Sequence, residues 1–415
     1  MIDLGLRPEE RRALLRTLRD SHQRRITVTM RNRNEDAQEA IRVSSRLVAG
    51  EVMGDVSQDV TRSLSLGLVD PEGKLRFEGR SPAHGAVFAD RFVSVEYGVF
   101  VPDEIGDWVD VPVFWGPVTD FSRNGHLVTI EAQGKERLML APHYATEGYT
   151  LPKGLRVDEA IRRVARKTGE RRFNLPRIDR KLSNPRTVSA RAEPWKVING
   201  GEEDARGRKI AGIVERAPGN RFAFYDGAGR LTVRRRNQNP AITIRDSRDL
   251  VEAPDIQYDN LDAINTVVVR GREPDGKGKK RARAKVTLPD GHPISPVSLR
   301  RNGENRHMTE FVDTELRTDL ECANRARQIL RRRSAQGVDA ELRVVPNPLL
   351  EELDVIRLAT DEYDFEFPLR HWVLPLTDGP MTLATRRRTD RRLKARKRYK
   401  FKGGAVIDRK YKGGL

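Results

Sequence analysis

The strongest pattern in the chain runs over residues 41–71, IRVSSRLVAGEVMGDVSQDVTRSLSLGLVDP. In its second half Leu64, Leu66 and Leu68 alternate with small residues, and the run stops at the turn sequence DPEG of residues 70–73. Successive side chains of a β-strand point to opposite faces, so leucines two residues apart share one face. The spacing predicts one half-buried strand that ends in a tight turn.

The same kind of pattern continues on both sides of this strand. Strand-like runs separated by turn residues are predicted at 26–30, 92–97, 108–115, 127–132, 340–345 and 355–358. Such closely spaced short strands favour a barrel or a sandwich and differ from the strand–helix alternation of a parallel sheet. The chain is therefore expected to be predominantly β.

Helices are predicted at a few places. Residues 8–20 begin with proline, carry two acids in the first turn and place leucines on one face. Residues 157–167 have apolar residues at helical spacing before Gly169, and a short helix opens at Pro194. A hairpin is predicted around residues 226–229. A further helix at 313–334 is expected to bury the face formed by Leu316, Leu320, Ala323, Ala326 and Leu330.

These elements predict an α+β protein that is predominantly β, with two β regions that form barrels or sandwiches, a small inserted α+β module and a helix within the second β region. A chain of 415 residues is too long for one ordinary core. The expected division is an N-terminal helix and strand (1–40), a first β-barrel-like domain (41–150), a small α+β module (151–250), a second β-barrel-like domain (251–378) that contains the helix 313–334, and a basic C-terminal tail (379–415).

The composition predicts a soluble protein. Hydrophobic residues make up 37% and charged residues 33% of the chain, and no apolar run approaches the ~20 residues of a membrane helix, so no stable membrane insertion is expected. The first residues lack the basic start and apolar centre of a secretory signal, which predicts assembly in a cytoplasm. The lone cysteine, Cys322, excludes an internal disulfide and is expected to pack beside a helix.

The net charge of +18 is concentrated in two segments. Residues 270–285 hold eight Lys or Arg against two acids, and residues 386–415 hold fourteen against two, which together account for the whole excess. The rest of the chain is net neutral, as on an ordinary solvated surface. The C-terminal run has the composition of a disordered tail, and two interpretations stay open: a solvated appendage, or an arm that orders against an acidic neighbour or DNA.

Residues of these two segments are the candidate contacts to a partner or an anion. In the basic loop they are Lys277, Lys279, Lys280, Arg281 and Arg283. In the C-terminal tail they are Arg386, Arg387, Arg388, Arg391, Arg392, Lys394, Arg396, Lys397 and Arg398.

No stretch carries a complete catalytic or cofactor-binding pattern. Residues 271–278, GREPDGKG, match a phosphate-binding loop except that Gly278 stands where Ser or Thr would hold magnesium, and the residues that follow alternate like a strand. The seven histidines lack the i, i+4 spacing of paired metal ligands. Adjacent acids such as Glu351 and Glu352 are expected to diverge. The four tryptophans are separate in sequence and are expected in the core. No catalytic residue, cofactor or metal site is therefore predicted.

Five segments carry a resemblance to a known family. The opening strand has the form G-x-V…D-V-T-R-S-L-S-L-x-L-V-D-P, and it is followed in order by residues 113–118, 224–233, 258–271 and 346–358. Together they resemble the tail-tip and baseplate hub proteins of bacteriophages, a family that includes the hub part of contractile injection spikes. The resemblance covers roughly residues 40 to 375 and leaves out the N-terminal helix and the basic C-terminus.

The resemblance implies a structural virion protein without enzymatic activity. Such a minor tail protein forms a homotrimeric hub at the tail tip, where it links distal tail and tube proteins, the tape measure and the tip, baseplate or receptor-binding proteins. DNA is an implied transient partner in the channel. Two alternatives from other classes stay open: a nucleic-acid-binding protein that acts through its basic loop and tail, and a tip-associated cell-wall hydrolase that assembles distant acids.

Overall fold

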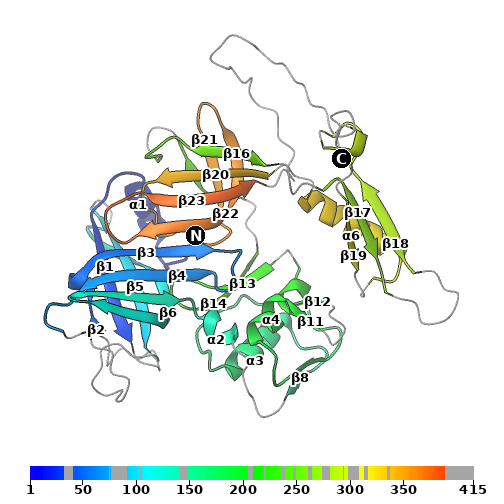
Figure 1. Cartoon of the computed structure of the whole chain (residues 1–415), viewed down its shortest axis with the longest axis horizontal. Helices are drawn as coiled ribbons and strands as arrows, with labels where there is room; N and C mark the ends of the chain where they lie inside the picture. Colours follow the sequence, from blue (N-terminus) through cyan, green and yellow to red (C-terminus); the bar gives the residue numbers. More distant parts are fainter. Residues whose placement is uncertain are drawn as a thin grey trace, which may run out of the picture. The chain divides into compact units, whose positions relative to one another are not determined.

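The computed structural model in Figure 1 describes residues 1–31, 41–73, 75, 91–102, 105–140, 148–203, 209–218, 221–235, 239–245, 249–259, 264–272, 281–292, 294–297, 308–312, 316–333 and 337–387. The chain forms two compact units. The first consists of Met1–Pro254, Leu342–Thr360 and Pro368–Ala384. The second consists of Asp255–Glu341, Asp361–Phe367 and Thr385–Leu415.

A long antiparallel sheet forms the larger part of the first unit (Figure 1, blue to cyan strands). Its strands pair in the order β3-β4-β7-β6-β5-β1-β2, with every neighbouring pair antiparallel. Their bounds are β1 (Arg24–Arg31), β2 (Ile41–Arg42), β3 (Leu47–Asp55), β4 (Arg62–Val69), β5 (Phe92–Val101), β6 (Asp107–Asn124) and β7 (Leu127–Gln133). Leu66 of β4 lies opposite Ile130 of β7, and both are fully buried, which places the core on this side of the sheet.

The strand predicted from the leucine alternation is confirmed as β4. Leu64, Leu66 and Leu68 are buried, and the residues between them are half-buried. The prediction was incomplete, because the same stretch also contains β2 and β3. Strand β3 was harder to predict, because it contains glycines, which have weak β-propensity. Gly54 is needed there, since a Cβ atom at this position would come within 2.2 Å of the Trp372 ring.

Other strands and a helix complete the first unit. The strands are β15 (Pro240–Ile244), which pairs in parallel with β21 (Val355–Ala359), and the parts of two further strands that lie within Pro368–Ala384. These two are β22 (Asp364–Pro375), which pairs with β3, and β23 (Met381–Arg387) beside β22. The N-terminal helix predicted at 8–20 is confirmed as α1 (Pro8–Thr17), with Leu14 and Leu18 buried. A short 3-10 turn, η1 (Ser44–Arg46), precedes β3.

The inserted module lies between β7 and β15 in the sequence. Its elements are α2 (Glu136–Leu140), β8 (Tyr149–Leu151), α3 (Val157–Lys167), β9 (Phe173–Asn174), β10 (Arg186–Val188), α4 (Pro194–Asn199), β11 (Glu202–Glu203), β12 (Lys209–Ile210), η2 (Val214–Arg216), β13 (Arg221–Tyr225) and β14 (Leu231–Arg235). The predicted helices at 157–167 and after Pro194 are confirmed, as is the hairpin, since β13 and β14 pair around residues 226–229. One core of aliphatic residues and Trp195 joins these elements.

The second unit contains two separate sets of strands. Strand β16 (Asp255–Asp259) pairs with the first residues of β20 (Gly337–Val344). Strand β17 (Thr266–Arg270) lies between β18 (Arg283–Thr287) and β19 (Met308–Val312), and α6 (Asp319–Arg333) packs on this small sheet. The core between them includes Cys322, Ala326 and Leu330, so the predicted packing of the lone cysteine is confirmed. Leu320 was wrongly assigned to the packed face, because it is 68% exposed in the first turn of α6.

The tryptophans divide into two kinds. Trp195 and Trp372 are buried in the core, as predicted. The prediction was wrong for Trp108 and Trp115, which are half-buried and stack against arginines. Two guanidinium groups lie over the Trp115 ring, with their central carbons 3.9 Å (Arg172) and 4.4 Å (Arg31) from its centroid. An indole face attracts cations, so these rings are placed by charge as well as by burial. The structure as a whole is α+β and predominantly β, as expected.

Candidate functional site

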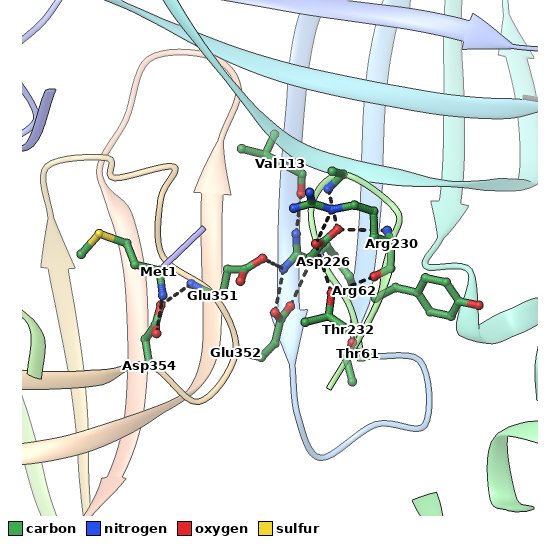
Figure 2. Close-up of polar contacts among 12 residues, drawn as sticks. Met1, Thr61, Arg62, Val113, Asp226, Arg230, Thr232, Glu351, Glu352 and Asp354 are labelled. Atoms are coloured by element: carbon green, nitrogen blue, oxygen red, sulfur yellow. Dashed lines mark hydrogen bonds and ion pairs between the residues drawn. The ribbon is translucent and has the colours of Figure 1, made fainter. Parts of the chain in front are cut away.

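The most unusual feature of the first unit is a cluster of charged side chains, most of them buried, called here the buried charge network, and Figure 2 shows the part of it around Arg62. Four carboxyl groups pair with three arginines and the amino group of Met1, and a fifth, Glu136, lies near Glu352. Proteins seldom bury charges without partners. Its members are Met1, Arg62, Glu136, Asp226, Arg230, Arg234, Glu351, Glu352 and Asp354.

Arg62 is the centre of the network. It is the first residue of β4 and shares the inward face of that strand with the leucines, which explains its 3% exposure. Its Nε and Nη2 donate to the two carboxylate oxygens of Glu352 at 3.0 and 2.6 Å, and Nη1 donates to the carbonyl of Val113 at 3.0 Å. Burial alone would lower the pKa of Arg62, but Glu352 and Glu351 raise the pKa above its usual value. The guanidinium is therefore permanently charged.

The turn at residues 349–354 supplies three of the carboxylates. Glu351, Glu352 and Asp354 are all buried. Both glutamates approach Arg62, since its Nη2 is 2.6 Å from Glu352 Oε2 and 3.7 Å from Glu351 Oε1. The prediction that these adjacent acids diverge was wrong, because they lie in a turn and not on a regular element. Leu353 has φ of 60°, which a non-glycine residue rarely adopts.

The turn is also closed by its own hydrogen bonds. The N–H of Glu351 donates to Asp354 Oδ2 at 2.9 Å, and the N–H of Asp354 donates to the carbonyl of Glu351 at 3.1 Å. The amino group of Met1 lies 2.5 Å from the Asp354 carboxylate. The carboxyl groups are therefore fixed in position by the backbone around them.

The β13–β14 hairpin brings the inserted module to the network. Asp226 accepts hydrogen bonds from the N–H of Ala228 (3.1 Å), from the N–H and Nε of Arg230 (3.0 and 2.9 Å) and from the Thr232 hydroxyl (3.1 Å). Such a side chain that closes its own turn holds the loop in one shape.

Two glycines in this hairpin allow it to approach β6 closely. A Cβ atom at Gly227 would lie 2.2 Å from the carbonyl oxygen of Pro112, and one at Gly229 would lie 2.6 Å from the Trp115 ring. Gly229 also has φ of +68°, a conformation that glycine adopts without strain. The DGAG sequence therefore serves close contact between module and sheet.

Arg234 makes the second link between the module and the 349–354 turn. From β14, its Nη2 donates to the carbonyl of Glu352 at 2.5 Å, and its Nη1 lies 3.2 Å from Asp354 and 3.6 Å from Glu351. Burial raises the pKa of Glu351 to about 7, with the nearby Glu352 adding to the rise and Arg62 opposing it.

Glu136 is the first residue of α2 and the fifth acid of the network. Among the described contacts, no cation lies at hydrogen-bond distance from its carboxyl group. Its Oε1 accepts from the Thr61 hydroxyl at 2.6 Å and from the N–H of Tyr225 at 3.2 Å, while its buried Oε2 has no hydrogen-bond partner. Burial raises its pKa to about 7. The neighbouring Lys135 is paired with Glu170 at 2.8 Å.

Acids with raised pKa are candidates for proton transfer. The five carboxyl groups and Arg62 are buried, and a surface pocket of about 200 Å³ in this unit is lined by α1, β15 and residues near Val344, with no network member. Within the described ranges, no three His, Cys, Asp or Glu side chains are arranged to hold a metal ion. No helix in the described part of the chain is long and apolar enough to cross a membrane. The arrangement is suited to holding chain segments together.

The basic residues predicted as partner contacts are only partly described. Arg281 donates from Nε to the carbonyl of Gly271 at 2.7 Å, and Arg283 is exposed on β18. Arg386 and Arg387 belong to β23, but their side chains are outside the described structure. Also outside it are Lys277, Lys279, Lys280, Arg388, Arg391, Arg392, Lys394, Arg396, Lys397 and Arg398. The run after the would-be phosphate loop forms strand β18, as predicted, and not the helix that such a loop requires.

One signal for the network was present in the sequence. Arg62 stands two residues before Leu64, so the alternation that buries the leucines also places Arg62 on the inward face. Its partner Glu352 is 290 residues away, and no local pattern connects them.

Comparison with known proteins identifies the fold. No family model matches the sequence, and no curated protein matches it. Among solved structures, the chain is similar to the 43 kDa tail protein of prophage MuSo2 from Shewanella oneidensis, with 12% identity and a TM-score of 0.57 over 88% of this chain and 99% of that one. This chain has the fold of a phage tail protein. A tail protein from Neisseria meningitidis MC58 gives 13% identity and a TM-score of 0.52 over 87% and 96% of the two chains. The resemblance to tail proteins found in the sequence is confirmed at the level of the fold.

Proposed function

We propose that the chain is a structural protein of a phage tail, and that it forms a homotrimeric hub at the distal end of the tail tube. The observation that carries this proposal is the tail-protein fold, shared over 88% of this chain and 99% of the prophage protein. Coverage of nearly the whole of both chains argues that the entire architecture, and not one common domain, is shared.

The buried charge network supports a structural role. It joins β4, the inserted module and the 349–354 turn, which are far apart in the sequence, and no network member lines the pocket beside α1 and β15. An enzyme would need its perturbed acids to face a substrate cavity. The proposal therefore assigns the protein no enzymatic activity, and a zymogram on bacterial cell walls tests the hydrolase alternative. Lysis that Glu136→Gln or Glu351→Gln abolishes would overturn the assignment.

In this proposal residues 41–150 and 251–378 supply the two hub domains, and 151–250 forms a module that braces the first of them. Ring closure in a homotrimer would protect strand edges that would otherwise remain open to uncontrolled pairing. The neighbours are distal tail and tube proteins, the tape measure and tip proteins, with DNA passing transiently through the channel.

The C-terminal tail provides the contact to an acidic neighbour. Three copies would bring about +36 together, since each carries fourteen basic residues against two acids after Thr385, and such repulsion opposes assembly unless negative charge lies nearby. A chain that ends at Thr385 should keep its thermal unfolding transition but enter particles less well, in a way that depends on salt. Equal incorporation at every salt concentration would show that the tail has no such role.

The same truncated chain separates this function from nucleic-acid binding. A DNA-binding protein that uses its basic tail loses affinity steeply with salt, and removal of fourteen basic residues should reduce the salt slope strongly. If the protein is a hub, tails should assemble equally well with and without added DNA, whether they contain the full-length or the truncated chain. Assembly that requires added DNA would favour the alternative.

A further inference from the structure

The buried charge network holds one more acid than it has cations. Arg62, Arg230, Arg234 and the Met1 amino group supply four positive charges, whereas Glu351, Glu352, Asp354, Asp226 and Glu136 supply five carboxyl groups. A cation lies within 4 Å of the carboxyl group of each of Glu351, Glu352, Asp354 and Asp226. Glu136 is the one left over.

Burial favours the neutral form of Glu136, whereas the two hydrogen bonds donated to its Oε1 favour the ionised form and oppose this effect in part. From the β3–β4 loop it meets the Thr61 hydroxyl, and from β13 it meets the N–H of Tyr225. The unpartnered Oε2 packs over Gly134, where a Cβ atom would lie 2.2 Å from it.

The charged groups near Glu136 give it no compensation. The charge of the 349–354 turn that acts on Glu136 is the negative charge of Glu352, which raises the pKa of Glu136 further. Lys135 is occupied by Glu170, which also accepts from the Tyr225 hydroxyl at 2.9 Å, and Arg62 is committed to Glu351 and Glu352. An uncompensated buried carboxylate costs several kcal/mol, so the group keeps a proton instead.

We propose that Glu136 is a proton-sensitive latch, which holds the inserted module against the sheet while its carboxyl group is protonated and loosens the module when that group ionises. Glu136 is suited to this role because it bridges the sheet and the inserted module. Its carboxyl group contacts Thr61, in the β3–β4 loop of the sheet, and Tyr225 of the module. Ionisation would place a negative charge beside Glu352 at this junction.

The sign of the pH dependence follows from the direction of the shift. A carboxyl group whose pKa is raised in the folded state stabilises that state fully below its unfolded pKa, near 4.5, and loses this contribution as the pH rises to about 7. The docked module is therefore tightest in mildly acidic solution and weakest above neutral pH. For one group with these two pKa values, the opening equilibrium should increase about tenfold between pH 6 and pH 8.5.

Hydrogen–deuterium exchange on the full chain measures this opening directly. Peptides covering α2 and the β13–β14 hairpin should lose about tenfold in protection between pH 6 and pH 8.5, after correction for the intrinsic exchange rate. In Glu136→Gln, which keeps the size of the side chain and cannot ionise, this tenfold change should be lost, and only a change that depends on Glu351, whose pKa burial also raises to about 7, should remain. Glu351→Gln is the matched control, because it removes the other buried acid with a raised pKa, one that has cation partners, and the tenfold change that depends on Glu136 should remain.

Two results would overturn the proposal. One is equal protection of the wild-type hairpin at both pH values, and the other is a pH dependence abolished by Glu351→Gln and kept by Glu136→Gln. If Glu136→Gln does not fold, infrared spectroscopy of Glu351→Gln still provides the test, because this variant lacks the other buried acid whose pKa is raised to about 7. A carbonyl band of a buried protonated carboxylic acid should be present at pH 6 and disappear as the pH rises through about 7. Absence of that band at pH 6 would also reject the latch.

Discussion

Replacement of Arg62 by methionine should strongly destabilise the first unit. The substitution keeps an unbranched side chain in the core but leaves Glu352 without its two charge-assisted hydrogen bonds and Glu351 without a cation 3.7 Å away. The carbonyl of Val113 also loses its donor. Removal of one partner from a buried ion pair costs about 3–5 kcal/mol, because the other charge stays buried.

Urea unfolding followed by tryptophan fluorescence measures this cost, since the Trp372 ring lies 5.2 Å from the Arg62 guanidinium. Arg62→Met should lower the unfolding midpoint with little change in slope. The control is Arg163→Met, which removes a half-exposed cation 3.5 Å from Glu159 and should change stability by less than about 0.5 kcal/mol.

A double substitution tests whether charge is the cause. Adding Glu352→Gln to Arg62→Met removes the orphaned negative charge and should recover at least about 1 kcal/mol, a coupling expected for two residues in direct contact. A loss below about 1 kcal/mol for Arg62→Met, or no recovery in the double variant, would refute the view that this network stabilises the unit.

Three further predictions concern the packing. Gly229→Ala should destabilise the first unit by about 1–3 kcal/mol, because its φ of +68° and the Trp115 ring both oppose a side chain. In the same denaturation assay, the control Gly125→Ala should cost only about 1 kcal/mol, because Gly125 has φ of +60° but lies in open space. On α6, Leu330→Ala should cost about 2–5 kcal/mol and the exposed Leu320→Ala less than about 0.5 kcal/mol; equal losses would contradict the observed helix phase. The buried Cys322 thiol should react with a thiol reagent only in denaturant, and rapid reaction in the native protein would contradict its burial in the α6 core.

The sequence predicted best those features that depend on local periodicity. The leucines of β4, the helix α3 with its glycine stop and the β13–β14 hairpin all follow from spacing and turn chemistry within a few residues. Leu320 was misassigned for a related reason. The predicted helix began too early, and a residue of the first turn was counted as part of the packed face.

The network could not be predicted, because its contacts join distant parts of the chain. The alternation along β4 places Arg62 on the inward face of the strand, but only the folded structure brings Glu352 to it. The two adjacent glutamates converge because the turn passes through Leu353 at φ of 60°, which no composition rule would anticipate for leucine. The glycine contacts with β6 likewise depend on tertiary approach, and the DGAG sequence alone indicated only a turn.

The proposal that this chain is a tail hub is tested most directly by electron cryomicroscopy of intact tails, with the chain located by an antibody or a fused marker. The proposal predicts three copies in one closed ring at the distal end of the tail tube, with the tail-protein fold fitting the density. One or six copies at that level, or a marker found away from the tail, would contradict it.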